Sequence, residues 1–253
     1  MPLSPTAAVK EVQDVSLLAA KAFGSIFRRP HYVRDILIQM ELIGVGSLAV
    51  VMLTGFFTGA VLTLQTSKTL STFGAVGYTG ALVAVSLVRE LGPVLASLMV
   101  AGRVGSGIAS ELGSMLVTEQ INAMRALGTD PIKKLVVPRL LATISMLPVI
   151  TIVADAMGIL GGLFTSVFVL NITPNLYLNR AWDSLRYMDL FGGLLKPLVF
   201  GATLAIVSCH CGLRTYGGTQ GVGRSTTQAV VASSILIIVS DLFLTRIILA
   251  YTR

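Results

Sequence analysis

Long apolar runs separated by short polar stretches dominate the chain. The first run, Leu42 to Leu64, contains no charged residue, and at about 1.5 Å per helical residue it is long enough to cross about 30 Å of hydrocarbon. Four more apolar regions follow it, at about Gly77 to Leu116, Leu140 to Leu170, about Leu190 to Leu213 and about Ser225 to Tyr251. The pattern predicts an all-α, polytopic integral membrane protein with five transmembrane helices.

The segment before the first run, residues 1–39, mixes charged and apolar residues instead. No apolar core follows a short basic region, so a cleaved signal peptide is not expected, and acidic residues such as Glu11 and Asp14 count against a transit peptide. We expect an amphipathic helix that lies at the membrane interface with its basic face toward the headgroups. The alternative is a solvated cytoplasmic tail.

The composition agrees with a membrane protein. Of 253 residues, 54% are hydrophobic and 12% are charged, with a mean hydropathy of +0.82. The charged fraction of soluble domains is usually about 25%. These values exclude a disordered chain, a secreted disulfide scaffold and an ordinary cytosolic enzyme. The two cysteines, Cys209 and Cys211, are too close together to build a disulfide framework.

The net charge of +7 indicates cations that face the cytoplasm rather than nucleic-acid binding. With a cytoplasmic N-terminus, eleven Lys and Arg residues lie on the cytoplasmic side: Lys10, Lys21, Arg28, Arg29, Arg34, Arg125, Lys133, Lys134, Arg139, Arg214 and Arg224. Four lie on the far side: Lys68, Arg180, Arg186 and Arg253. The bias predicts a cytoplasmic N-terminus, and five spans then place the C-terminus on the far side.

The polar stretch between the second and third spans has a helical pattern of its own. Four apolar residues recur at steps of four, three and three, and would share one face of a short helix: Val117, Ile121, Met124 and Leu127. Gly128 fits a C-terminal cap, and Asp130-Pro131 would then end the helix. The pattern predicts a short cytoplasmic amphipathic helix, which either docks a cytoplasmic partner or simply lies at the interface.

Charged residues inside the apolar regions are candidates for function. Each costs about 2.5–3.5 kcal/mol at the centre of a membrane helix, so each should have a partner or face a cavity. Arg89 and Glu90 are adjacent and precede Gly92-Pro93, where a kink or break is expected. In a regular helix Arg89 and Glu90 could not both face the same partner. Lys196 lies at a comparable depth in the fourth span. Contact with a lipid and a structural ion pair with another helix both remain open.

The other intramembrane charges favour structural roles. Arg103 and Glu111 are expected in interhelical ion pairs. For Asp155 and Asp241, a buried pair with Arg103 or Arg246 is expected. Glycines are dense in the second and third spans, at Gly102, Gly105, Gly107, Gly113, Gly158, Gly161 and Gly162, and indicate close helix packing.

Two apparent motifs do not carry chemistry. The glycine-rich run from Gly217 to Gly223 lacks the Gly-Lys-Ser/Thr of a phosphate-binding loop and is expected to be a turn. Cys209-His210-Cys211 lacks a second pair of ligands, so no metal site is predicted. No nucleophile or metalloprotease signature is present, and we predict no catalytic residue.

Several long runs resemble the MlaE permease family, the membrane subunits of MCE-associated ABC lipid transporters. They are Arg89 to Ala96, Ala101 to Ser106, Glu111 to Met115, Thr118 to Gln120, Arg125 to Gly128, Asp130-Pro131, Pro138-Arg139, Gly221 to Thr227, and Ser240-Asp241. The resemblance extends from about Pro30 onward. It divides the chain into an N-terminal amphipathic segment, residues 1–39, and an MlaE-type permease domain, residues 40–253.

The resemblance implies a homodimer in the bacterial inner membrane, with its C-terminus in the periplasm. Its partners would be an ABC ATPase subunit and a periplasmic MCE-domain protein, and a small STAS-type cytoplasmic subunit is a further candidate. The chain would be a non-catalytic permease without a cofactor, because the ATPase would bind ATP and Mg. It would move phospholipid and contribute to outer-membrane lipid homeostasis. No nucleic acid is expected.

The resemblance also implies two sites. A lipid-binding cavity would involve Arg89, Glu90, Leu91, Lys196, Leu62, Gln65, Leu70 and Phe73. The short cytoplasmic helix would couple to the ATPase through Glu119, Gln120, Ile121, Met124, Arg125, Leu127, Gly128, Asp130 and Pro131. The rival hypothesis is a self-contained ion-coupled carrier of lipid or a small molecule, with Arg89, Glu90, Asp155 and Asp241 as an ion relay.

Overall fold

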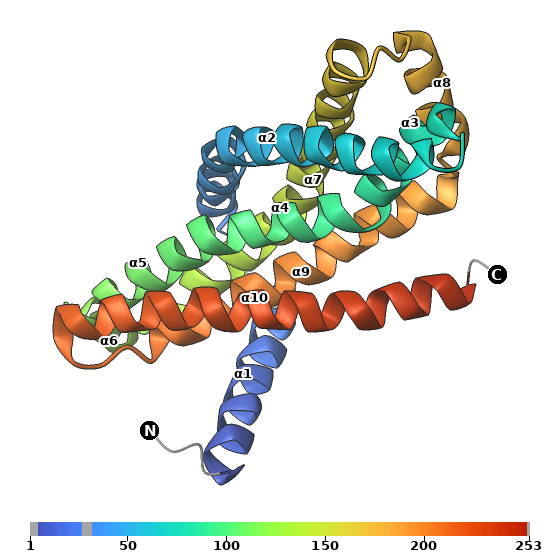
Figure 1. The fold of residues 1–253 in the computed structure, drawn as a ribbon. Coiled ribbons are helices and arrows are strands. Elements are labelled where there is room, and N and C mark those ends of the chain that lie inside the picture. The colour runs from blue at the N-terminus through green and yellow to red at the C-terminus, as the bar shows by residue number, and fades with distance from the viewer. Residues whose placement is uncertain (1–4, 27–31, 252–253) are drawn as a thin grey trace. The chain divides into compact units, whose positions relative to one another are not determined.

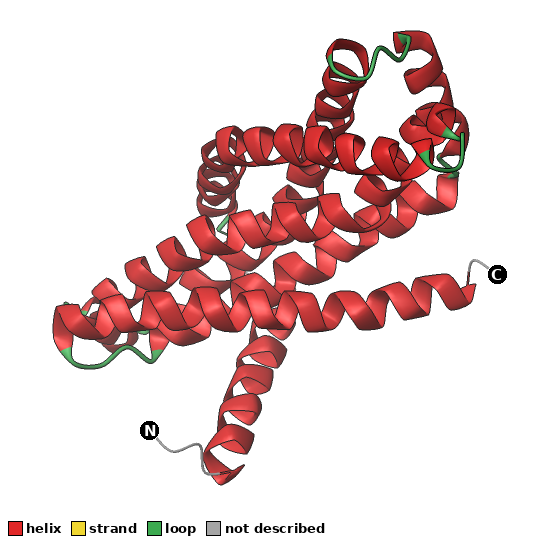
Figure 2. Ribbon diagram, in the orientation of Figure 1, coloured by secondary structure: helices red, strands yellow, loops and turns green. Residues whose placement is uncertain are grey.

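The structure, a computed structural model, describes residues 5–26 and 32–251. Every regular element within these residues is a helix, and they contain no strand (Figure 2). Arg28, Arg29 and Arg253, which were assigned to loops on the two sides of the membrane, lie outside the described residues. The all-α prediction is confirmed.

Among the described residues, five helical stretches are long and apolar enough to cross a membrane, as predicted. They are Val33–Ser71 (α2), Val76–Val117, Ile132–Phe168, Tyr187–Leu213 (α9) and Gly218–Ala250, which belongs to α10 (Gly218–Tyr251) (Figure 1). The second stretch is a succession of η1 (Val76–Tyr78), α3 (Thr79–Ser86), η2 (Leu87–Leu91), α4 (Gly92–Val100), η3 (Ala101–Gly105) and α5 (Ser106–Val117). The third consists of η4 (Ile132–Val136) and α7 (Val137–Phe168). The remaining helices are α1 (Pro5–Ile26), α6 (Gln120–Ala126) and α8 (Pro174–Ser184).

The chain divides into two compact units, which are described separately. Unit 1 comprises Met1–Ile43, Ala101–Ser145 and Gly201–Ile237. Unit 2 comprises Gly44–Val100, Met146–Phe200 and Ile238–Arg253. Each unit therefore contains one end of each of the five spans.

Ion pairs between helices hold unit 1 together. Arg139 of α7 is 3% exposed, and its Nη2 lies 2.7 Å from Oε2 of Glu111 on α5, which confirms the interhelical pair expected for Glu111. The first helix, α1, joins the same unit through Asp14, whose Oδ2 lies 3.1 Å from Nη1 of Arg214. Arg103 Nη1 donates to the carbonyl of Leu42 at 3.2 Å.

Close helix packing, predicted from the glycines, is confirmed in unit 2. A Cβ atom added to Gly59 of α2 would lie 1.9 Å from the carbonyl oxygen of Gly158 on α7. A Cβ on Gly161 would lie at the same distance from the carbonyl oxygen of Phe56. The two backbones are thus in direct contact, which only residues without side chains allow.

Helix α8 was not predicted, since residues 171–189 read as a polar connection. It begins after Thr173 in extended conformation, with Pro174 in its first turn, where the missing N–H costs nothing. It buries only two residues, Tyr177 and Ala181, one turn apart. Burial raises the pKa of Tyr177 to about 12. Pro174 and four polar or charged residues in this segment are typical of a connection, so the composition did not identify the helix: Asn175, Asn179, Arg180 and Asp183.

The glycine-rich run is a turn only in part. Gly217 and Gly218 adopt positive φ values of 89° and 67°, which L-residues rarely accept. The residues from Gly218 onward already belong to α10. A Cβ on Gly221 would lie 1.9 Å from the carbonyl oxygen of Tyr216, so this glycine serves the close return of the chain.

Candidate functional site

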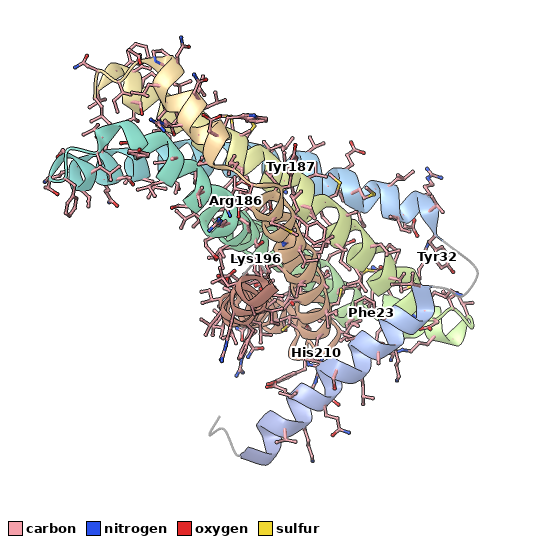
Figure 3. The ribbon with its side chains drawn as sticks, turned by 90° about the vertical axis from the view of Figure 1, so that its right-hand side faces the viewer. Phe23, Tyr32, Arg186, Tyr187, Lys196 and His210 are labelled. Carbon is pink, nitrogen blue, oxygen red and sulfur yellow. The ribbon has the colours of Figure 1, made fainter. Side chains whose placement is uncertain are left out.

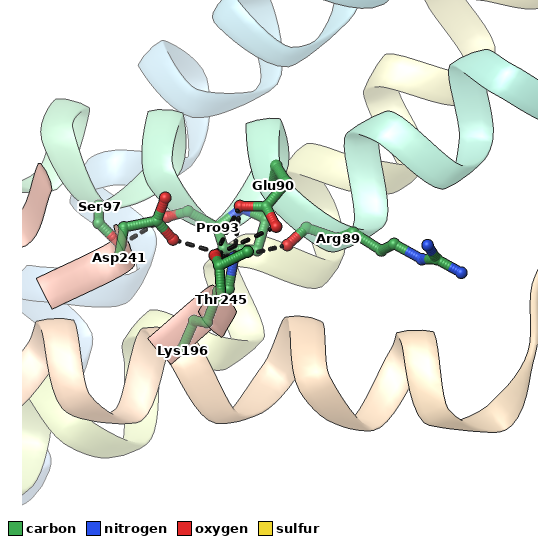
Figure 4. Close-up of polar contacts among 7 residues, drawn as sticks. All are labelled: Arg89, Glu90, Pro93, Ser97, Lys196, Asp241 and Thr245. Atoms are coloured by element: carbon green, nitrogen blue, oxygen red, sulfur yellow. Dashed lines mark hydrogen bonds and ion pairs between the residues drawn. The ribbon is translucent and has the colours of Figure 1, made fainter. Parts of the chain in front are cut away.

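The second span changes its helical geometry where Arg89 and Glu90 lie. Residues Leu87–Leu91 form a π-helical turn, η2, directly before Gly92-Pro93, where a kink or break was expected; the helix is irregular there but continues into α4. Pro93 has no N–H to bond the carbonyl oxygen of Arg89 four residues earlier. Lys196 Nζ donates to that carbonyl oxygen instead, at 3.0 Å (Figure 4).

Lys196 is the centre of a polar cluster formed by η2, α9 and α10. Its side chain is 2% exposed, and its Nζ lies 2.5 Å from Oε2 of Glu90 and 2.9 Å from Oδ1 of Asp241. The same ammonium donates to Oγ1 of Thr245 at 2.8 Å, and the Thr245 hydroxyl donates onward to Glu90 at 3.2 Å. A structural ion pair with another helix, one of the two alternatives for these charges, is therefore present. It joins one buried cation to two carboxylates.

Two adjacent glycines on α9 allow this approach. A Cβ on Gly193 would lie 2.3 Å from the carbonyl oxygen of Val88 on η2, and one on Gly192 would lie 3.1 Å from Cγ2 of Ile248 on α10. The two glycines therefore bring α9 close to both neighbours, one turn before Lys196. Larger residues would separate the three segments and leave the ammonium without its partners.

Arg89 turns to a different partner from Glu90, as the sequence predicted. Its Nε donates to Oδ1 of Asp189 at 2.7 Å, and the Asp189 side chain is only 8% exposed. The other oxygen of Asp189, Oδ2, accepts the backbone N–H of Arg186 at 3.1 Å, at the start of α9. Figure 3 labels Arg186, which directly precedes α9, and Lys196 within α9. Both oxygens of Asp189 are thus engaged.

A cavity of about 590 Å³ lies in unit 2. The paired residues Arg89 and Asp189 line it, and so do Lys196 and Glu90. This volume lies within the range of about 300–1,000 Å³ that is typical of ligand pockets. Its lining is mixed, with charged residues beside apolar ones: Arg89, Glu90, Arg186, Met188, Asp189, Gly192, Gly193, Lys196, Thr245, Arg246, Ile248, Leu249 and Ala250. A cavity of this kind suits an amphipathic ligand better than a purely polar or purely apolar one.

The residues predicted for a lipid cavity divide into two groups. Arg89, Glu90 and Lys196 come together, whereas Leu91 is half-buried beside them and is not among the lining residues. The others lie on the second half of α2 and in the turn after it: Leu62, Gln65, Leu70 and Phe73, of which Phe73 is 78% exposed. They also do not line this cavity, and their role stays a prediction.

The partners expected for the two intramembrane aspartates were wrong. Asp241 pairs with Lys196 rather than with Arg103 or Arg246. Asp155 forms no ion pair with any described residue and faces Gly92, where a Cβ would lie 1.7 Å from its Oδ1. Charge and depth alone cannot select a partner, because the helix contacts decide which side chains meet.

Asp189 and Thr245 are site residues that sequence reasoning missed. Thr245 lies one helical turn after Asp241, so both project from the same face of α10. Asp189 lies in the first turn of α9, three residues after Arg186, a position typical of side chains that bond the backbone at a helix start. No group of three His, Cys, Asp or Glu side chains suited to a metal ion occurs in the described part of the chain.

The short helix predicted between the second and third spans is present in unit 1 as α6, but it begins later than expected. Val117 is the last residue of α5, and Glu119 adopts a left-handed φ of 59°, which separates the two helices. Val117 therefore does not share a helix with Ile121. Gln120 is the first residue of α6, and the Asn122 side chain bonds the Glu119 carboxylate.

The end of α6 follows the prediction for Gly128. This glycine has a φ of 74°; its N–H donates to the carbonyl of Arg125, and the next N–H, of Thr129, donates to that of Met124. These two bonds form a Schellman motif. Asp130-Pro131 does not end this helix but begins the next one, since Asp130 Oδ1 accepts the N–H of Ile132 at 2.9 Å.

The apolar residues of α6 are not equally buried. Ile121 is fully buried and fixes the helix to unit 1, Met124 is half-buried, and Leu127 is 83% exposed at the turn. Arg125 is also exposed. The helix thus presents a leucine and an arginine outward from an anchored position.

Comparison with known proteins identifies relatives along nearly the whole chain. The model of the family Permease MlaE matches residues 36–247. A probable ABC transporter permease protein of Rickettsia typhi is 44% identical over 95% of this chain and 94% of its own length. A probable ABC transporter permease protein of Synechocystis is also 44% identical, over 83% and 80% of the two chains. The chloroplastic protein TRIGALACTOSYLDIACYLGLYCEROL 1 of Arabidopsis thaliana is 36% identical over 95% and 69%. The chain therefore belongs to the MlaE permease family and is a multi-pass membrane permease subunit of an ABC transporter.

Proposed function

We propose that this permease moves phospholipid between the bacterial inner membrane and a periplasmic MCE-domain carrier, and so contributes to outer-membrane lipid homeostasis. The observation that carries the proposal is the cavity of about 590 Å³ in unit 2, built from membrane-spanning helices and lined by both charged and apolar residues. A diacyl lipid has the same two-part chemistry. The Arabidopsis relative is named after trigalactosyldiacylglycerol, a diacylglycerol lipid, and this name supports a lipid substrate.

The distribution of cations supports a cytoplasmic N-terminus. All described Lys and Arg residues assigned to the cytoplasmic side fall in unit 1: Lys10, Lys21, Arg34, Arg125, Lys133, Lys134, Arg139, Arg214 and Arg224. The described residues assigned to the far side fall in unit 2: Lys68, Arg180 and Arg186. This separation agrees with a cytoplasmic N-terminus and a periplasmic C-terminus.

In this assembly α6 is the coupling helix. Two copies of the chain associate with ATPase subunits, which bind ATP and Mg, and with the MCE-domain protein; a small STAS-type subunit is a further candidate. Fully buried Ile121 anchors α6 to unit 1, so a force applied at exposed Leu127 or Arg125 is transmitted to the permease. An exposed apolar side chain next to a cation is better accommodated in the groove of a partner protein than in water.

Removal of lipid from a bilayer costs about 0.8 kcal/mol per CH₂ group, so net transport requires an energy source. The experiment is lipid transfer by the purified, reconstituted transporter. Leu127→Asp should uncouple ATP hydrolysis from transfer without unfolding the chain, since this side chain is 83% exposed. Arg224→Gln, at an exposed position of α10, is the control. Unchanged coupling in Leu127→Asp would contradict the role of α6.

The alternative function is a self-contained ion-coupled carrier. The observation that favours it is the set of ionisable residues within the spans, among them Glu90, Asp155 and Asp241. Transport by the chain alone in liposomes, driven by an ion gradient without ATP, would support this alternative and overturn the ABC-coupled mechanism for lipid.

A further inference from the structure

The cavity in unit 2 holds more cations than its carboxylates neutralise. Four cationic side chains line it: Arg89, Arg186, Lys196 and Arg246. Arg89 is paired with Asp189, and Lys196 is paired with Glu90 and Asp241. The other two cations, Arg186 and Arg246, form no ion pair with any residue that the structure describes.

The surrounding carboxylates are already in use. Asp189, which lines the same cavity as Arg186, gives one oxygen to Arg89 Nε and the other to the backbone N–H of Arg186. Glu90 and Asp241 both face the ammonium of Lys196, and Thr245 donates to both oxygens of Glu90. The two guanidinium groups therefore remain positively charged at the cavity without an internal counter-ion.

Both arginines also lie at the ends of spans. Arg186 directly precedes α9, which begins at Tyr187, and Arg246 lies in the last turns of α10, which ends at Tyr251. Consecutive spans cross the membrane in opposite directions, so the start of one and the end of the next lie on the same side. The ends of transmembrane spans generally lie near the lipid headgroups. The same cavity is lined by Met188, Ile248 and Leu249, which offer apolar contacts beside the two cations.

We propose that Arg186 and Arg246 together bind the phosphate of a phospholipid headgroup in this cavity. The proposal rests on the proposed lipid-transport function and names the part of the lipid that the site selects. A guanidinium offers parallel N–H donors that match the spacing of phosphate oxygens, and its positive charge balances the negative charge of a phosphodiester. The paired cations, Arg89 and Lys196, keep their internal partners and shape the wall of the site.

The test is lipid binding to the full-length protein purified in a maltoside detergent, measured by calorimetry. Three probes separate the sources of binding: dihexanoylphosphatidylcholine, dihexanoylglycerol with the same acyl chains but no phosphate, and inorganic phosphate. Arg186→Gln, Arg246→Gln and the double variant are compared with wild type. Arg224→Gln is the matched control, because this exposed arginine lies on α10 but not at the cavity.

We expect wild type and Arg224→Gln to bind the phospholipid more tightly than the phosphate-free lipid. Each cavity variant should weaken phospholipid binding about tenfold, equal to about 1.4 kcal/mol, and leave dihexanoylglycerol binding unchanged. Competition by inorganic phosphate that is lost in the double variant would also support the site, and would show that it accepts free phosphate.

Equal binding of the two lipids by wild type, or a phosphate preference that survives in the double variant, would overturn the headgroup site and leave the lipid-transport function standing. Failure of wild type to bind either lipid would overturn the lipid-transport function, and this proposal with it. Circular dichroism of every variant establishes that the helices are intact.

Discussion

Replacement of Lys196 by methionine would remove the shared counter-charge of Glu90 and Asp241 while nearly preserving the side-chain volume. The Lys196 side chain is 2% exposed, whereas those of Glu90 and Asp241 are 42% and 20% exposed. Removal of one partner of a buried ion pair costs about 3–5 kcal/mol. Since both carboxylates retain some access to solvent, we expect the lower end, a loss of about 3 kcal/mol in the free energy of unfolding.

The assay is unfolding in detergent micelles as the fraction of dodecyl sulfate is raised, followed by circular dichroism. Lys134→Met is the matched control, because Lys134 pairs with Asp35 at side-chain exposures of 35% and 33%. A pair of this exposure should contribute about 1 kcal/mol or less. The triple variant Lys196→Met/Glu90→Gln/Asp241→Asn removes all three charges and should regain at least half of the lost stability.

The reasoning would be refuted if Lys196→Met stayed within about 1 kcal/mol of wild type, a loss no larger than that of an exposed pair. A triple variant no more stable than Lys196→Met would also refute it. That outcome would mean that packing around the methylene groups of Lys196, and not charge compensation, stabilises this cluster.

Other perturbations test the fold and the coupling helix. Gly59→Ala should destabilise unit 2 by about 1–3 kcal/mol in the same assay, because its Cβ meets the Gly158 carbonyl, whereas Gly107→Ala, with nothing within 4 Å, should not. Gly128→Ala, at a φ of 74°, should cost about 1–2 kcal/mol and speed hydrogen exchange in α6; unchanged exchange would contradict the Schellman cap. Because the pKa of Tyr177 is raised from 10.0 to about 12, the unfolded chain loses its proton first. Stability that is full below about pH 10 should therefore fall between about pH 10 and 12, and Tyr177→Phe should lose this part of the pH dependence; an unchanged slope would contradict it.

The local features of the chain could be predicted because their causes are local. A run such as Leu42 to Leu64 must be helical in a membrane, whatever surrounds it. Gly128 could be identified as a helix cap because the left-handed conformation that ends a helix favours glycine. The irregular helical turn directly before Gly92-Pro93 follows from the missing N–H of proline.

The composition of the site could be predicted only in part. Arg89, Glu90 and Lys196 were identified, but the partners Asp189 and Thr245 were not, and Asp241 was assigned to the wrong cation. Lys196 and Glu90 are separated by 106 residues. Hydrophobic periodicity reports which faces avoid water, and it holds no information on which helix meets which.

The sequence by itself therefore determined the five spans, their helical nature and the division of cations between two sets of loops, since these follow from transfer of side chains and backbone out of water. Tertiary structure alone decided the ion pairs and the cavity. Glycine contacts, such as that of Gly193 with the Val88 carbonyl, set the distance between helices, and at that distance one buried lysine meets two carboxylates. The same packing leaves Arg186 and Arg246 as the unneutralised cations among the residues described at the cavity, because Asp189, Glu90 and Asp241 each bond or pair with another donor.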